Sequence, residues 1–141
     1  MTVIINTPRP PLNLFDVARV EVDDTVAGVE LYEVPVYRIP AEGPNPQRDV
    51  RAAAILTNLI AANTSAGTAN ITVWVVDADD NEFLVAQSLE IAQDGYIKID
   101  LDKQILQSEE RIIARMDAGN TAEVHLSFVL NQREEFTVLE P

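Results

Sequence analysis

Short runs of alternating apolar and polar residues, separated by turn-forming residues, recur along most of the chain. A clear run covers residues 69–76, where Ile71, Val73 and Val75 share one face, and another covers residues 122–130. A period of two places successive side chains on opposite faces of a β-strand. Strands at intervals of roughly 8–12 residues are typical of antiparallel sandwiches and barrels. We therefore expect an all-β fold, an antiparallel β-sandwich of jelly-roll or immunoglobulin-like size.

One segment is ambiguous between helix and strand. In residues 50–62, VRAAAILTNLIAA, positions Ile55, Leu59 and Ala62 fall at helical spacing. Alternate residues from Ala52 onward suit a strand equally well, and periodicity does not separate the two. We expect a strand, because the residues that follow are clearly of β type.

The two ends of the chain differ from the middle. After a short possible strand at residues 2–5, three prolines fix φ and remove backbone donors, which favours an extended path. Such an arm lies along its own domain, reaches a neighbouring subunit, or is disordered, as chain termini often are. The predicted organisation is an extended N-terminal arm (1–15), a β-sandwich domain (16–131) and a C-terminal tail or edge strand (132–141).

Charge and composition exclude several function classes. Ten Lys and Arg against 23 Asp and Glu give a net charge of −13, which disfavours nucleic acid and anionic lipid as partners. No apolar run approaches the ~20 residues of a membrane helix, and the N-terminus resembles no secretory leader. The absence of cysteine removes disulfides, thiol nucleophiles and thiolate metal sites.

No residue pattern points to catalysis. The single histidine, His125, is expected on the outward face of a strand, and no G-x-S-x-G sequence supplies an activated serine. The acidic turn at residues 77–82 resembles the start of a calcium loop, but Glu82 replaces the glycine and Ser88 the closing glutamate. We expect an ordinary polar turn there, and a non-enzymatic protein with no metal or cofactor.

Surface residues are the remaining candidates for function. Trp74 and Val76 alternate with the predicted core face of their strand, so they are expected to be exposed and to contact another protein. The alternative is that the chain's own arm or tail covers them. Two nearby cations in an acidic chain and the arm prolines complete the set. The candidate contact residues are Trp74, Arg48, Arg51, Pro8, Pro10 and Pro11.

Several segments, taken in order, are similar to a widespread group of small virion proteins of tailed bacteriophages. The similarity covers residues 32–130 and departs from the usual pattern at residues 108–110, where Ser-Glu-Glu replaces a glycine-aspartate turn. The segments that carry it are YEVPVYRIPA (32–41), LTNLIAANTS (56–65), ANITVWVV (69–76), LVAQSLEIAQDG (84–95), EERIIARM (109–116) and AEVHLSFV (122–129).

This resemblance implies a structural component of a phage particle, assembled in the host cytoplasm. The leading expectation is a capsid cement or decoration protein, a homo-oligomer that bridges subunits of the major capsid protein. A neck, collar or tail-associated protein is the alternative within the same particle. A carbohydrate-binding host-recognition module is a further alternative, with Trp74, Tyr96 or Tyr32 stacking on sugars and calcium at the 77–82 turn.

Overall fold

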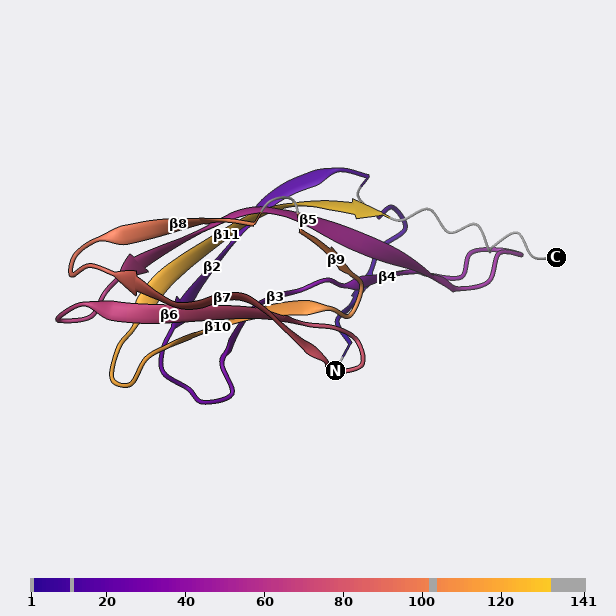
Figure 1. The fold of residues 1–141 in the computed structure, drawn as a ribbon. Coiled ribbons are helices and arrows are strands. Elements are labelled where there is room, and N and C mark those ends of the chain that lie inside the picture. The colour runs from indigo at the N-terminus through magenta and orange to yellow at the C-terminus, as the bar shows by residue number, and fades with distance from the viewer. Residues whose placement is uncertain (1, 11, 102–103, 133–141) are drawn as a thin grey trace.

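The computed structural model describes residues 2–10, 12–101 and 104–132, and within them the backbone forms strands and no helix. Two sheets pack face to face, which confirms the predicted all-β sandwich (Figure 1). No helix in this part of the chain is long and apolar enough to cross a membrane. The strands are β1 (Ile4–Asn6), β2 (Leu14–Val22), β3 (Val29–Glu33), β4 (Val36–Ile39), β5 (Arg48–Asn63), β6 (Ala69–Val76), β7 (Glu82–Ile91), β8 (Tyr96–Asp100), β9 (Ile105–Gln107), β10 (Arg111–Met116) and β11 (Ala122–Gln132).

The larger sheet is organised around β5, whose 16 residues confirm the strand expected in the ambiguous segment. Its order is β1-β4-β5-β11-β2, and β8 and β9 also pair with β5. A bulge opposite Ser127 and Phe128 changes the phase of the buried positions, from Ala54 and Leu56 before it to Leu59 and Ala61 after it. Because the extra residue bends and twists the strand, no single period describes β5 from end to end.

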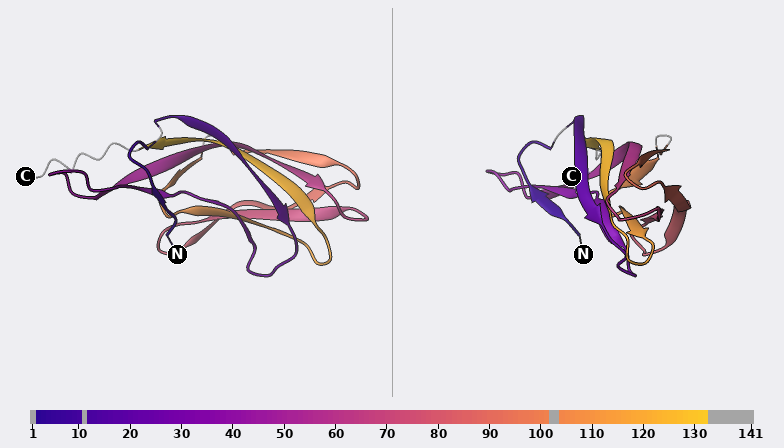
Figure 2. Two further views of the ribbon diagram at one scale, coloured as in Figure 1. Left: turned by 180° about the vertical axis from the view of Figure 1, so that it is seen from behind. Right: turned by 90° about the vertical axis from the view of Figure 1, so that its left-hand side faces the viewer.

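The smaller sheet has the order β3-β10-β6-β7 and forms the second layer, as the end-on view in Figure 2 shows. The predicted inward face of β6 is confirmed, since Ile71, Val73 and Val75 are buried. The expected exposure of Val76 is wrong, because its side chain is only 2% exposed. Val76 pairs with Arg111 on one side and Glu82 on the other, so long side chains flank it from both neighbouring strands.

The core lies between the sheets and is almost entirely aliphatic. The inward residues of β11 follow the predicted alternation, and Phe128 is the largest fully covered side chain among them. Its ring lies 4.3 Å from that of Tyr32, at an interplanar angle of 31°. Burial raises the pKa of Tyr32, as expected for a phenol packed against the core.

Asn63, at the end of β5, is a buried polar clamp. Its side-chain amide nitrogen donates to the carbonyl oxygens of Gly67, Ile91 and Ala92, at 2.8–3.2 Å. Its Oδ1 accepts a hydrogen bond from the backbone N–H of Ser65. Asn63 belongs to the segment LTNLIAANTS (56–65), and its contacts give that segment a structural role in joining the two sheets.

The beginning of the predicted arm lies along its own domain. Strand β1 pairs with β4 in parallel, with Ile4 opposite Val36, and the Thr2 hydroxyl donates to the carboxylate of Glu109 at 2.7 Å. The last two residues of the predicted arm, Leu14 and Phe15, belong to β2 and pair with β11. Residues 133–141 of the predicted tail lie outside the described residues.

Candidate functional site

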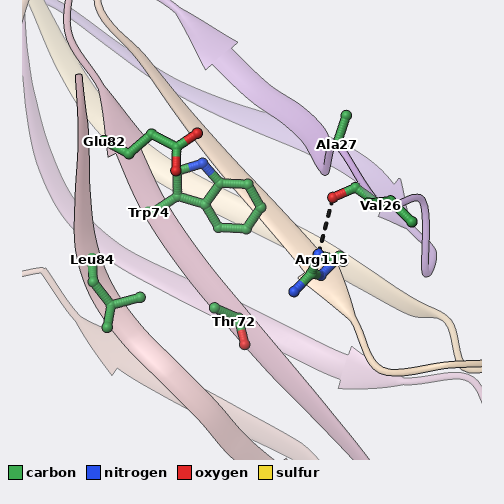
Figure 3. A pocket seen from close by; sticks show the side chains of 7 residues that line it. All are labelled: Val26, Ala27, Thr72, Trp74, Glu82, Leu84 and Arg115. Atoms are coloured by element: carbon green, nitrogen blue, oxygen red, sulfur yellow. Dashed lines mark hydrogen bonds between the residues drawn. The ribbon is translucent and has the colours of Figure 1, made fainter. Parts of the chain in front are cut away.

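Trp74 projects from the outer face of the smaller sheet into a groove. It lies in β6 between Leu84 of β7 and Ile113 of β10. Figure 3 shows the indole between the β7 side chains and the segment that joins β2 to β3. The groove has a volume of about 390 Å³. We call it the Trp74 groove; its lining residues are Val26, Ala27, Thr72, Trp74, Glu82, Leu84 and Arg115.

The indole is held in place from two sides. Arg115 of β10 places its Cζ 6.0 Å from the ring centroid, within reach of a cation–π interaction. The same guanidinium donates to the Val26 carbonyl at 3.0 Å, which fixes the connection between β2 and β3 beside the ring. The indole Nε1 is buried and has no hydrogen-bond partner among the described residues. Trp74 is therefore a partly buried anchor and less exposed than the sequence alone indicated.

The rim of the Trp74 groove is apolar and open to solvent. Val26 is 82% exposed and Leu84 is 58% exposed, one on each side of the indole. Aliphatic side chains exposed next to a partly buried tryptophan are typical of protein contact surfaces. The sequence pointed to the face through Trp74 but not to these neighbours, which come from other segments.

A second apolar surface crosses the outer face of the larger sheet. In the strand register, Phe15 of β2 lies opposite Val129 of β11, Val129 opposite Ile55 of β5, and Ile55 opposite Ile105 of β9. Phe15 is 79% exposed and Ile105 is 54% exposed. We call these four residues the Phe15 row. Sequence reasoning missed the row, because its members come from four strands that are distant in the chain.

The two predicted contact cations lie on the larger sheet, away from the sheet that carries Trp74. Arg48 is exposed at the start of β5, opposite Ile39. Arg51 is engaged within the chain: its guanidinium donates to the Ser108 carbonyl at 3.2 Å and lies 3.5 Å from the Glu109 carboxylate. The structure therefore does not bring Arg48 and Arg51 together with Trp74 into one site.

The arm prolines take different environments. Pro8 is exposed and Pro10 is half-buried, both in the connection between β1 and β2. Pro11 lies outside the described residues. The described residues of this connection are not among those that line the Trp74 groove.

The acidic turn between β6 and β7 is built by its own hydrogen bonds. One carboxylate oxygen of Asp77 accepts from the backbone N–H groups of Asp79 and Asn81 at 2.9 Å, and the other accepts from the Asn81 amide. These hydrogen bonds hold the pKa of Asp77 below its usual range, and the bond from the Asn81 backbone has the largest effect. Asp80 forms an ion pair with Arg111 at 3.3 Å. Within the described ranges, no group of three or more potential ligands is arranged for a metal ion.

His125 lies on the outer face of β11, as expected, between Arg19 of β2 and Ile60 of β5. Its Nε2 is 3.9 Å from the carboxylate of Glu123, two residues earlier on the same strand. His125 therefore belongs to a charged surface of the larger sheet, beside the Phe15 row.

Comparison with known proteins gives structural neighbours from viral particles. No family model matches the chain, and no curated protein matches it. A chain of the IBDV viral particle overlaps 85% of this chain at 10% identity with a TM-score of 0.40. A chain of infectious bursal disease virus Gx strain overlaps 89% at 12% identity, also with a TM-score of 0.40. The chain spans 31% and 35% of the length of these two neighbours, and overlaps of this quality do not assign it to a family.

Proposed function

We propose that this protein is a non-enzymatic capsid cement or decoration protein of a tailed-phage particle, which bridges subunits of the major capsid protein. The observation that carries the proposal is the pair of apolar surfaces on opposite faces of one sandwich. The Trp74 groove lies on the outer face of the smaller sheet, and the Phe15 row lies on that of the larger sheet. A small protein with an apolar surface on each side is suited to hold two neighbours at once.

Charge and sequence pattern support the same function. A net charge of −13 makes contact with packaged DNA unfavourable and suits a position on the outside of a particle. The order of short segments along residues 32–130 is similar to that of small phage virion proteins. The partners in this proposal are other virion proteins and further copies of the chain, with neither nucleic acid nor membrane.

A carbohydrate-binding function has less support from the arrangement of the aromatic residues. Tyr32 stacks on Phe128 of the core, so its ring does not offer a free face beside Trp74. Tyr96 is exposed, but it lies in β8 of the other sheet. The three expected stacking platforms therefore do not form one sugar-binding surface.

Adding the purified protein back to particles that lack it tests the proposal. We expect Leu84→Glu in the Trp74 groove and Ile105→Glu in the Phe15 row each to lower the number of bound copies at least tenfold, because a carboxylate replaces an apolar contact. Tyr96→Glu, at an exposed aromatic residue outside both surfaces, is the control and should bind normally. Normal binding by both test variants would rule out the two-surface arrangement.

Copy number separates cement from the alternative position at the neck or tail. Quantitative mass spectrometry of purified particles should give many copies of this chain for each shell, in a fixed ratio to the major capsid protein. A single ring of copies in each particle would favour the neck or tail-associated protein.

A further inference from the structure

Strand β2 forms the border of the larger sheet. Within the described residues its ladder partner is β11, along all nine residues from Leu14 to Val22. The end-on view in Figure 2 shows β2 next to β11, and β2 ends the strand order of the sheet. A border strand presents a row of backbone N–H and C=O groups that another strand can pair with.

Two hydrogen bonds identify the residues whose backbone groups face this border. The N–H of Val17 donates to the carboxylate of the preceding residue, Asp16, at 2.8 Å, and the carbonyl of Ser127, which lies opposite Val17 on β11, accepts from the Thr57 hydroxyl of β5 on the other side. In an antiparallel pair, the N–H and C=O of one residue point to the same side and alternate along the strand. The backbone groups of Arg19 and Glu21 therefore point the same way as those of Val17.

The side chains of Arg19 and Glu21 have opposite charges and share the outer face of the sheet. Both residues are exposed, and neither forms an ion pair within the described part of the chain. On the β11 side, Arg19 lies opposite His125, and Glu21 lies opposite Glu123, which has the same charge. Among the described residues, the protein's own sheet therefore leaves this pair of charges without an ion-pair partner.

We propose that β2 pairs with β2 of a second copy, antiparallel, about a two-fold axis that passes beside Val20. In this register Arg19 lies opposite Glu21 of the second copy, and Glu21 lies opposite Arg19 of the second copy. The symmetry makes the ion pair occur twice, and both pairs fall on the same face of the continuous sheet. Opposite charges directly across two strands stabilise their pairing, and like charges destabilise it.

Other symmetric registers fit the residues less well. An axis at Arg19 places two arginines opposite each other. An axis at Ala18 places Arg19 opposite Val17, and uses the Val17 N–H that Asp16 already occupies. The axis at Val20 pairs both charges and leaves the bond between Val17 and Asp16 in place.

This pairing rests on the proposed function and specifies how the two copies in the proposed homo-oligomer contact each other. The two-fold axis is perpendicular to the sheet, so the outer faces of both larger sheets point in one direction. The two Phe15 rows then lie on one side of the dimer, and the two Trp74 grooves lie on the other. Such a dimer presents a pair of identical apolar contacts on each of its two sides.

Charge reversal in the free protein tests the pairing without any particle. Sedimentation equilibrium of the full chain should show a dimer, with a dissociation constant that rises with salt. We expect Arg19→Glu and Glu21→Arg each to weaken dimerisation about tenfold or more, and the double variant R19E/E21R to return to within about threefold of the parent. Lys98→Glu, the same charge change in β8 of the same face, is the control and should not alter the dimer.

Failure of the β2 pairing can be distinguished from failure of the proposed function. Glu21→Arg relieves the like charges of Glu21 and Glu123 inside one copy, so it should fold at least as stably as the parent. Weaker dimerisation in that variant therefore reports on the second copy. A monomeric parent, or a double variant that stays as weak as the single ones, would overturn the pairing. Normal particle binding by a monomeric variant would leave the proposed function intact.

Single cysteines determine the register, because the chain contains no cysteine of its own. Directly opposite residues in a non-hydrogen-bonded pair have Cα atoms about 4.5 Å apart, within the range of a disulfide. Val20→Cys should form a disulfide-linked dimer under mild oxidation, and Ala18→Cys and Arg19→Cys should remain largely unlinked. Preferential linkage at residue 18 or 19, or none at all, would contradict the register.

Discussion

The indole of Trp74 packs directly against the backbone of Gly28, and a side chain at Gly28 would occupy the same space. A Cβ atom at that position would lie 2.6 Å from Cη2 of Trp74 and would also contact Ile113. Gly28 has a φ of +89°, a conformation that residues with a side chain rarely adopt. The connection between β2 and β3 is therefore shaped to cover one edge of the tryptophan.

Replacement of Gly28 tests this packing. We expect Gly28→Ala to lower the free energy of unfolding by about 2–4 kcal/mol, from backbone strain and overpacking together. Gly43 also has a positive φ but has no atoms within 4 Å of an added Cβ. Gly43→Ala should therefore cost only about 1 kcal/mol in the same urea titration. Equal losses in the two variants would show that the contact with Trp74 adds nothing.

Trp74 contributes to stability as well as to a surface. Because Gly28 and Arg115 cover part of the ring, we expect Trp74→Ala to lower the free energy of unfolding by about 1–3 kcal/mol, less than for a fully buried tryptophan. Leu84→Ala, at a 58% exposed position on the rim, should change it by less than about 0.5 kcal/mol. Thermal unfolding followed by circular dichroism measures both, and a Leu84 variant as unstable as the Trp74 variant would contradict the description of the groove.

Asn63 should be among the most sensitive polar residues. In Asn63→Ala the carbonyls of Gly67, Ile91 and Ala92 lose their shared donor, and the N–H of Ser65 loses its acceptor. We expect a loss of about 2–3 kcal/mol in the free energy of unfolding, since Asn63 is buried. The exposed Asn45 supplies the comparison, and Asn45→Ala should be nearly neutral. An equally mild Asn63 variant would mean that water replaces the clamp.

Acid should weaken the turn between β6 and β7. The hydrogen bonds from Asn81 and Asp79 hold the pKa of Asp77 below its usual range in the folded protein. A carboxyl with a lowered folded pKa stabilises the protein above its unfolded pKa, and this contribution is lost as the pH falls through the folded pKa. The difference in unfolding free energy between the parent and Asp77→Ala should be constant from pH 7 to 5 and shrink below about pH 4. A difference that does not vary with pH would contradict the assignment.

The sequence predicted the elements whose pattern is local. The inward faces of β6 and β11 follow a strict period of two, so Val73 and Leu126 were assigned correctly. The phase change in β5 was not visible, because a bulge depends on the strand opposite it. Strand β9 has only three residues, too few for a recognisable alternation, and it pairs with β5.

In the candidate site, too, the sequence predicted what depends on the local pattern and missed what depends on the neighbouring strands. The pattern placed Trp74 on the outer face, but the positions of Leu84 and Arg115 depend on which strands flank β6. The proximity of Arg48 and Arg51 in sequence indicated a shared contact. In the structure, Arg51 instead donates to the Ser108 carbonyl and forms an ion pair with Glu109. The Phe15 row follows only from the register of four strands.

Cryo-electron microscopy of the purified native particle, with this chain traced into the density, tests the proposed function most directly. The proposal predicts density for the sandwich repeated across the whole shell, with the Trp74 groove and the Phe15 row each against a neighbouring subunit. Density confined to the unique vertex, or particles without this chain, would contradict the proposed role as a capsid cement protein.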